Sequence, residues 1–219
     1  MLGSTVQRRK PQREDMIMGT ATIRRCSTRQ GTRALLLTII LTIAFSMLGP
    51  VKAYALSKGQ TFKQGGNTYR IDDYDAADRE GDVVLVTYGS TNTKPTINII
   101  RYKGVTFEVE TIGAGAFNTA RGHRVTSVKI GRHVDRIKSH AFTGCKKLKT
   151  LNMRASDIIE LRKRGAGWVV DDNDAAKGAF TGINPKVRVL CGSDSSKYRA
   201  TYKRALTSRG MAQSVTVVQ

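Results

Sequence analysis

Residues 134–142 read VDRIKSHAF, and residues 109–117, 25 positions earlier, read VETIGAGAF. Each stretch places an aliphatic residue five positions before the Phe of an Ala-Phe pair, and a third such pair stands at 179–180. Spaced apolar residues follow the first two pairs, namely Val125, Val128 and Ile130, then Leu148, Leu151 and Met153. A repeat of about 25 residues is typical of a solenoid, in which each unit buries its apolar face against its neighbours.

The apolar run after each Ala-Phe pair predicts one short strand of a parallel sheet per unit, at 125–130 and at 148–153. Strands of successive units then stack about 4.8 Å apart. The aliphatic and aromatic positions of the repeat point inward in this arrangement and form ladders in the core. The predicted core residues are Ile112, Phe117, Ile137, Phe142 and Phe180.

The segment before the repeats predicts a capping element. Residues 56–110 contain short alternating stretches, the strongest at 82–88, and we expect them to form an N-terminal β-rich cap. The repeats then occupy 111–190. An insertion near 155–174 lengthens the third unit, and insertions in repeat proteins form loops on one face, often the binding face.

The C-terminal segment, residues 191–219, predicts a second cap made of a helix and a strand. Ser193 and Asp194 can N-cap a helix that runs to about Arg209, because Ser and Asp oxygens accept from the free N–H groups of a first turn. A final strand is expected at 214–218. The expected fold class is therefore mainly β (α+β), a short repeat solenoid with an N-terminal β cap and a C-terminal helix-strand cap.

The N-terminus predicts a secretory signal. Residues 34–48 form an apolar run that follows four arginines and precedes the helix breaker Gly49-Pro50. A small-x-small site ends at Ala55, so we expect a signal peptide with an extended basic n-region at 1–55, cleaved after Ala55. The alternative is an uncleaved anchor, although a spanning helix needs about 20 apolar residues. Either reading predicts a secreted or cell-surface protein that meets the membrane only through this segment.

The charge balance indicates anionic partners. The chain carries a formal net charge of +20, and residues 56–219 hold 28 Lys and Arg against 15 Asp and Glu. A surface of that sign attracts acidic polymers, although a merely solvated surface is the alternative. We expect a protein, an acidic glycan or a wall polymer as ligand, and we do not expect nucleic acid. The sequence leaves the oligomeric state open.

The repeat resembles a known family. Residues 137–153 read IKSHAFTGCKKLKTLNM and are similar to the BspA-type leucine-rich repeat, I-x-x-x-A-F-x-x-C-x-x-L-x-x-I-x-I-P. The resemblance implies a leucine-rich-repeat solenoid in an exported bacterial protein that binds host molecules, other cells or wall polymers. It implies no shared catalytic residues. The chain departs from the family pattern in having only about three repeats, of which the first and third are irregular.

Basic side chains in and near the repeats are the candidate ligand contacts. Arg124 and Lys129 belong to the first predicted strand region, and Lys147 and Lys149 to the second. The insertion adds a basic cluster beside a single tryptophan, which suits an acidic glycan through charge and stacking; the alternative for the tryptophan is packing of the insertion onto the repeats. The insertion residues are Arg162, Lys163, Arg164 and Trp168.

No pattern of residues indicates catalysis, a cofactor or a metal. The three histidines, at 123, 133 and 140, lack the spacing and partners of a zinc site. The acidic stretch 72–82 lacks the Gly and the bidentate Glu of a calcium loop, which leaves only a weak calcium site as an alternative. We expect Cys145 and Cys191 to be two buried thiols, with one bridge between them as the alternative.

These observations together predict a noncovalent binding module rather than an enzyme, acting at or outside the bacterial cell surface in adhesion or ligand binding. The alternative is a structural envelope protein that its positive charge retains on anionic wall polymers. The two differ in selectivity, because retention by charge alone is lost at high salt whatever the polymer.

Overall fold

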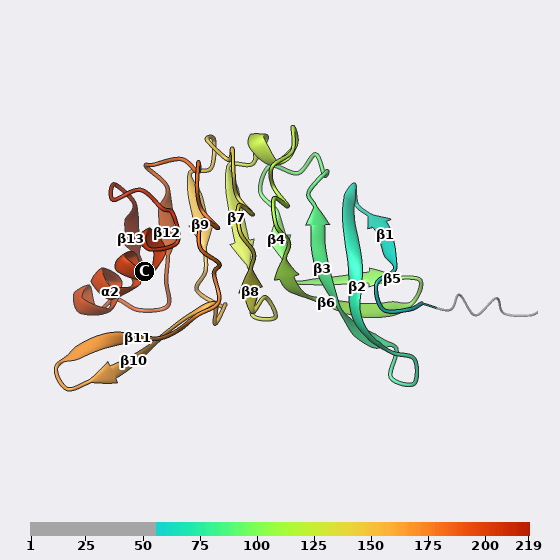
Figure 1. Cartoon of the computed structure of the whole chain (residues 1–219), viewed down its shortest axis with the longest axis horizontal. Helices are drawn as coiled ribbons and strands as arrows, with labels where there is room; N and C mark the ends of the chain where they lie inside the picture. The colour runs from blue at the N-terminus through green and yellow to red at the C-terminus, as the bar shows by residue number, and fades with distance from the viewer. Residues whose placement is uncertain (1–55) are drawn as a thin grey trace, which may run out of the picture. The chain divides into compact units, whose positions relative to one another are not determined.

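The computed structural model describes residues 56–219, and the predicted signal segment with its cleavage site after Ala55 lies outside them (Figure 1). The described residues are mainly β, with a parallel sheet and one α-helix. They form a six-stranded mixed sheet, a five-stranded parallel sheet and a separate two-stranded hairpin. This composition agrees with the mainly β fold that the sequence predicts.

The mixed sheet has the order β1-β2-β3-β6-β5, with β8 beside β6. Strands β1, β2 and β3 form an antiparallel meander, whereas β6 runs parallel to β3 and to β8. Alternating apolar residues bury one face of this sheet, as in the pattern of β6. Its strands are β1 (Thr61–Gln64), β2 (Asn67–Asp75), β3 (Glu80–Thr87), β5 (Ile99–Tyr102), β6 (Val105–Ile112) and β8 (Arg136–Ile137).

The parallel sheet has the order β13-β12-β9-β7-β4, and every neighbouring pair runs parallel (Figure 1). From β7 onward, each strand comes from the next unit of the chain. Two neighbouring parallel strands must be joined by a long connection. Between β7 and β9 this connection contains β8 of the mixed sheet and the Ala-Phe pair at 141–142. Its strands are β4 (Thr96–Ile97), β7 (Ser127–Ile130), β9 (Thr150–Asn152), β12 (Arg188–Leu190) and β13 (Thr216–Val218).

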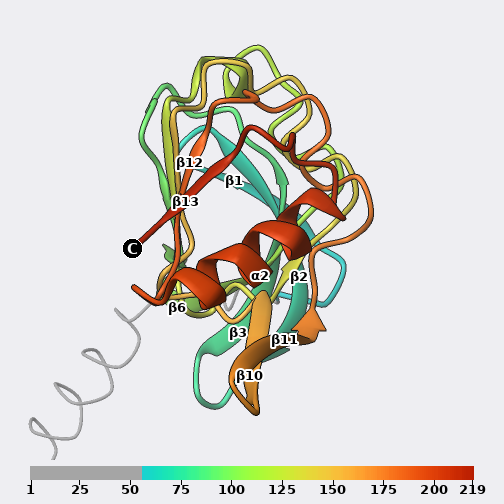
Figure 2. The ribbon, with the colours of Figure 1, turned by 90° about the vertical axis from the view of Figure 1, so that its left-hand side faces the viewer.

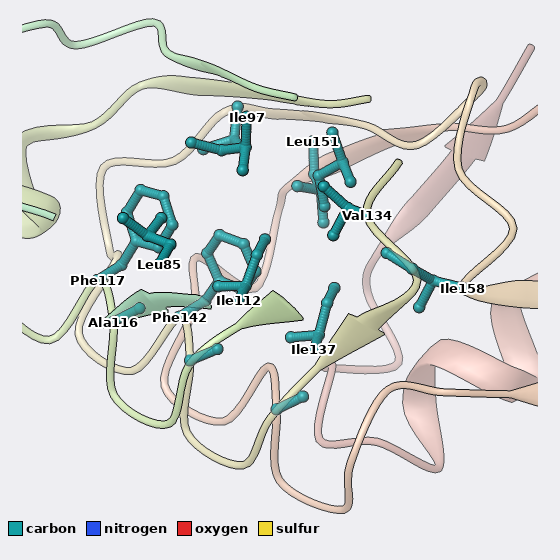
Figure 3. Packing of buried hydrophobic residues seen from close by; sticks show 14 of the residues in the cluster. Leu85, Ile97, Ile112, Ala116, Phe117, Val134, Ile137, Phe142, Leu151 and Ile158 are labelled. Carbon is teal, nitrogen blue, oxygen red and sulfur yellow. The ribbon is translucent and has the colours of Figure 1, made fainter. Parts of the chain in front are cut away.

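A stack of aromatic rings runs through the core between the sheets. The rings of Tyr88, Phe117, Phe142 and Phe180 follow one another, with centroids 4.7, 4.8 and 5.8 Å apart. Figure 3 shows Phe117 and Phe142 beside the aliphatic residues of the same units. The backbone repeats as well, because the Phe117 N–H donates to the Ala141 carbonyl at 2.8 Å and the Tyr88 N–H donates to the Ala116 carbonyl at 2.8 Å. All five predicted core residues are buried at 0% exposure.

The stack begins before the first Ala-Phe pair. Leu85 of β3 pairs with Ile112, and Tyr88 occupies the ring position one unit before Phe117. Ile97 of β4 likewise pairs with Ile130 of β7. A unit of the parallel stack therefore lies within residues 56–110, which the sequence assigned to the cap. The division at residue 110 stays a prediction, since nothing tests where a functional boundary falls.

The insertion is a hairpin and not the expected loop. Strands β10 (Ile159–Arg164) and β11 (Gly167–Asn173) pair antiparallel, with an irregularity between Glu160 and Leu161. Figure 2 shows this hairpin beside helix α2 (Ser196–Thr207). The contact between them includes a hydrogen bond of 3.3 Å from the Thr201 hydroxyl to the Trp168 carbonyl.

The start of α2 corrects the predicted cap. Ser195 is the N-cap, and its hydroxyl accepts from the Tyr198 N–H at 3.4 Å. The sequence placed this role on Ser193 and Asp194, which was wrong by one to two residues. Ser193 instead accepts from the Ser195 N–H at 3.2 Å and so shapes the turn before the helix. The correct choice needed the backbone of that turn, because all three residues are good N-caps.

Candidate binding surface

The outward face of the parallel sheet carries two rows of side chains in register. Strand residues alternate between faces, so the buried Val128, Leu151 and Val189 leave their neighbours directed outward. The pairing of the strands sets these neighbours side by side across the sheet. One row is Ser127, Thr150, Arg188 and Thr216, and the other is Thr96, Lys129, Asn152, Leu190 and Val218.

This face is free of carboxylates. None of the five described strands of the parallel sheet contains an Asp or a Glu. Lys129 and Arg188 are exposed, and hydroxyl and amide groups occupy most of the remaining outward positions. A sheet face with cationic and neutral hydrogen-bonding groups, and with no anionic ones, favours an anionic or hydroxyl-rich ligand.

A hollow of about 410 Å³ lies where β7 and β9 begin. We name it the lysine hollow; it is lined by Lys94, Thr126, Ser127, Lys149 and Thr150. Its floor is held by the backbone, because the Lys149 N–H donates to the Thr126 carbonyl at 2.8 Å and the Thr126 N–H donates to the Thr93 carbonyl at 2.8 Å. Its walls offer ammonium and hydroxyl groups, which are hydrogen-bond donors.

The structure places the predicted strand residues in two settings. Lys129 lies on β7 and faces outward, and Lys149 lines the lysine hollow just before β9. Arg124 belongs to a short 3-10 helix, Gly122–Arg124, and Lys147 to the turn before β9, so both were wrongly expected within strands. Both are exposed. The predicted strands at 125–130 and 148–153 were too long, because apolar residues in the flanking turns also pack inward.

The hairpin holds the other predicted cluster apart from these rows. Arg162 pairs with the Asp171 carboxylate across the hairpin, while Lys163 and Arg164 are exposed near its turn. The Trp168 ring meets the Tyr198 ring edge-on, with centroids 5.0 Å apart. Trp168 therefore packs the hairpin against α2 of the C-terminal cap, whereas the alternative from the sequence was packing onto the repeats. An indole used in this way presents less of its face to a sugar.

The outward face of the mixed sheet has the opposite charge. Asp73 on β2 pairs with Asp82 on β3, and Asp82 pairs with Glu108 on β6, so three carboxylates cross the sheet in one row. A hollow of about 280 Å³ opens over them, and we name it the acidic hollow. Its lining residues are Asp73, Asp75, Asp78, Glu80, Gly81, Asp82, Thr106 and Glu108.

Burial and the neighbouring carboxylates change the titration of Asp82. Burial, aided by the negative charges of Glu108, Asp73, Asp135 and Asp72, raises the pKa of Asp82 above the usual range of an aspartate. The ring of His133 reaches the row, since its Nδ1 lies 2.7 Å from a Glu108 carboxylate oxygen. Sequence reasoning saw an acidic stretch here but missed the row, although the alternation of the aspartates on β2 and β3 was a signal for it.

Within residues 56–219 there is no group of three or more His, Cys, Asp or Glu side chains placed to hold a metal ion. His123 contacts the side-chain oxygen of Asn118 at 3.1 Å. No helix in the same range has the length and apolar character needed to cross a membrane.

The two cysteines of the described residues are free and buried. Cys145 follows the second Ala-Phe pair and directs its sulfur to the carbonyls of Gly122 and Phe117, at 3.7 and 4.0 Å. Burial raises the pKa of the Cys145 thiol to about 12, so it stays protonated and unreactive near neutral pH. The prediction of two separate buried thiols is confirmed, and the alternative of one bridge between them is wrong.

Comparison with known proteins gives a limited likeness. No protein-family model matches the chain, and no curated protein matches it in sequence. Among solved structures, it is similar to a crystal structure of a leucine rich cell surface protein from Faecalibacterium prausnitzii A2-165. That match has a TM-score of 0.38 and 17% identity, and it covers 61% of this chain and 34% of the other. The likeness thus spans about a third of the other protein's length.

Proposed function

We propose that the protein is an exported, short leucine-rich-repeat solenoid that acts as a noncovalent binding module at or outside the bacterial cell surface. Its binding face is the outward face of the parallel sheet, and its ligand is an acidic polymer such as a wall polymer or an acidic glycan. The observation that carries the proposal is the row arrangement on that face, where Lys129, Arg188 and hydroxyl groups stand in register without a carboxylate.

The stacked units support the solenoid. Each unit contributes a ring to the aromatic stack, an aliphatic residue to the core and a strand to the parallel sheet. Ile112 pairs with Ile137, and Val128 pairs with Leu151, so equivalent positions of successive units lie next to each other. Contacts between neighbouring units of this kind are the defining feature of repeat proteins.

The distribution of charge supports an acidic ligand. Residues 111–219 hold 21 Lys and Arg against 7 Asp and Glu, whereas residues 56–110 hold 7 against 8. The excess of positive charge therefore belongs to the units that form most of the parallel sheet. Basic groups on one side of a protein raise the association rate of a polyanion and hold it by many weak contacts. We propose binding without catalysis.

A structural role in the envelope is the second candidate. It is favoured by exposed basic residues outside the parallel sheet, such as Lys163 and Arg164 on the hairpin and Lys197 on α2, which widen the positive surface beyond one face. In that role the protein is held on anionic wall polymers by charge alone and does not distinguish between their structures. The same polymers would bind in both cases, but only a recognition module would bind some of them more tightly than others of equal charge.

Binding to an array of immobilised polymers tests the proposal. The purified protein is applied to teichoic acid, acidic glycans, DNA and matrix proteins at low and at high salt. We expect one polymer class to be retained at high salt, and we expect Lys129→Glu to weaken that binding while the matched change Lys177→Glu does not. Equal binding to every polyanion, lost with salt, would support the structural role instead.

A further inference from the structure

The lysine hollow offers only one kind of chemistry to a ligand. We propose that it is a subsite for a tetrahedral oxyanion, the phosphate or sulfate group of a hydrophilic polymer. The inference rests on the proposed function, since it names the group of the acidic ligand that the parallel sheet engages first. Lys94, which sequence reasoning missed, is central to it together with Lys149.

The five lining residues come from three consecutive strand entrances. Lys94 precedes β4, Thr126 directly precedes β7 and Lys149 directly precedes β9, while Ser127 and Thr150 are the first residues of these two strands. Ser127 and Thr150 are register partners in adjacent parallel strands, so their hydroxyls lie on the same face, about 4.8 Å apart along the stack. Lys94 comes from the segment before β4, and Lys149 directly precedes Thr150 in the chain. The hollow therefore lies across three neighbouring strands of the parallel sheet.

The donors of the hollow are unused. Within residues 56–219, neither Lys94 nor Lys149 forms an ion pair, and the hydroxyls of Ser127 and Thr150 make no hydrogen bond. The Thr126 hydroxyl, in contrast, already donates to the Thr93 carbonyl at 3.2 Å. Two ammonium groups and two hydroxyls therefore face a common space without a protein acceptor.

The number and spread of these donors favour a tetrahedral anion. A carboxylate presents two oxygens in one plane, whereas a phosphate or sulfate monoester presents three terminal oxygens pointing in different directions. The two lysine ammonium groups and the two hydroxyls can donate to different oxygens of such a group. Hydrogen bonds from a charged donor to a charged acceptor are stronger than neutral ones. The absence of any carboxylate among the lining residues removes the repulsion that would oppose an anion.

The volume of the hollow points to an ester and not to a free ion. The space of about 410 Å³ exceeds what one phosphate needs, so it accommodates a neighbouring polyol or sugar unit as well. Lys129 and Asn152 form the adjacent register pair on the same face, and they continue the donor surface beyond the hollow. A polymer anchored at the hollow would extend along these positions.

Titration of the purified full chain with small anions at constant ionic strength tests the subsite. The probes are inorganic phosphate, glycerol 3-phosphate, inorganic sulfate and acetate, followed by calorimetry. We expect at least one tetrahedral anion to bind about tenfold more tightly than acetate, with the phosphate and sulfate arms showing which ester the site prefers. Acetate binding as tight as both tetrahedral anions would overturn the proposal.

Two double variants and a matched control separate a built site from general charge. Lys94→Gln with Lys149→Gln should abolish measurable binding of the preferred anion. Ser127→Ala with Thr150→Val keeps the net charge and should weaken binding roughly tenfold through lost hydrogen bonds to a charged group. The control, Lys58→Gln with Lys177→Gln, removes the same charge elsewhere and should change little. Unchanged binding in the hydroxyl variant, at an unchanged unfolding midpoint, would overturn the subsite.

Binding of an acidic polymer by the same variants tells the two proposals apart. If Lys129→Glu weakens polymer binding and the Lys94→Gln, Lys149→Gln variant does not, the subsite is wrong and the proposed function stands. If neither change affects polymer binding, the proposed function itself is wrong. Loss in both variants supports the subsite as the anchor of the polymer.

Discussion

The outward faces of the two sheets differ in charge although the same stacked core lies beneath both. On the mixed sheet, Asp73, Asp82 and Glu108 stand side by side in register. On the parallel sheet, the equivalent rows hold lysine, arginine, hydroxyl and amide groups and no carboxylate. Folding requires only the inward positions of such strands to be apolar, so the residue types at the outward positions can be set by function.

The acidic row shows that this division of charge does not serve stability. Like charges directly opposite each other on neighbouring strands destabilise a sheet. Burial raises the pKa of Asp82 most, and the neighbouring carboxylates raise it further. The parallel sheet avoids the problem by interposing hydroxyls and Asn152 between its cationic residues. The comparison therefore favours function as the reason for the basic face, and four changes test it.

The largest effect is expected from the core that both faces share. Phe142→Ala removes a ring from the middle of the aromatic stack, where Phe142 is at 0% exposure and contacts the rings on either side. The free energy of unfolding should fall by about 3–5 kcal/mol because a cavity replaces the ring. Urea unfolding measures it, with Lys146→Ala as an exposed control in the next turn. A loss of unfolding free energy below about 1 kcal/mol would show that the aromatic stack does not stabilise the core beneath the two sheets.

The next largest effect should come from reversing charge on the basic face. Lys129→Glu with Lys149→Glu should weaken binding of a sulfated polysaccharide such as heparin at least tenfold, or about 1.4 kcal/mol. The pair Lys58→Glu with Lys177→Glu alters the net charge equally but lies outside that face, and it should cost much less affinity. Equal losses in the two double variants would mean that total charge, and not the face, binds the polymer.

A smaller effect is expected on the hairpin. Lys163→Gln with Arg164→Gln removes two exposed charges, each worth about 0.5 kcal/mol at most, so heparin affinity should change roughly two- to threefold. Arg162 is left in place because it is paired with Asp171. The measurement is the heparin affinity of both proteins at low and at high salt. A loss as large as that of the Lys129, Lys149 variant would move the binding site to the hairpin.

The smallest effect concerns the acidic row and its pH dependence. The folded-state pKa of Asp82 is raised, so the folded protein binds more protons than the unfolded chain between the two pKa values. Stability should therefore fall as the pH rises from about 4 to about 7. Asp82→Asn should reduce this fall and add about 0.2–1 kcal/mol at neutral pH.

Unfolding midpoints in urea at both pH values provide the test, with Asp194→Asn as the control. Asp194 carries an exposed carboxylate outside the mixed sheet. An identical pH response in the Asp82→Asn variant and the parent chain would contradict the repulsion inferred for the row.

The sequence predicted the aromatic stack better than the charge of the two sheet faces. The Ala-Phe pairs at 116–117 and 141–142 mark the stack directly, because both residues of each pair are fully buried. The unit at Leu85 to Tyr88 has the same role without the motif, since its aliphatic and aromatic residues are closer together. This segment belongs to the stack because Leu85 pairs with Ile112, and no local sequence pattern reveals that pairing.

The candidate site was only partly predictable for a related reason. Lys129 and Lys149 could be picked out because they flank the repeat's apolar residues. Lys94 could not, because it precedes a two-residue strand that the sequence runs together with the next one. Which basic residues share a face depends on where each strand begins. The turns before β7 and β9 contain apolar residues, so the sequence pattern did not show where these strands start.

Hydrogen exchange of the protein with and without bound heparin maps the face that the polymer covers. We expect slowed exchange at 127–130 and 149–152, with no change at 73–82 on the acidic face. Protection confined to the hairpin at 159–173, or spread evenly over the chain, would contradict the assignment of binding to the parallel sheet.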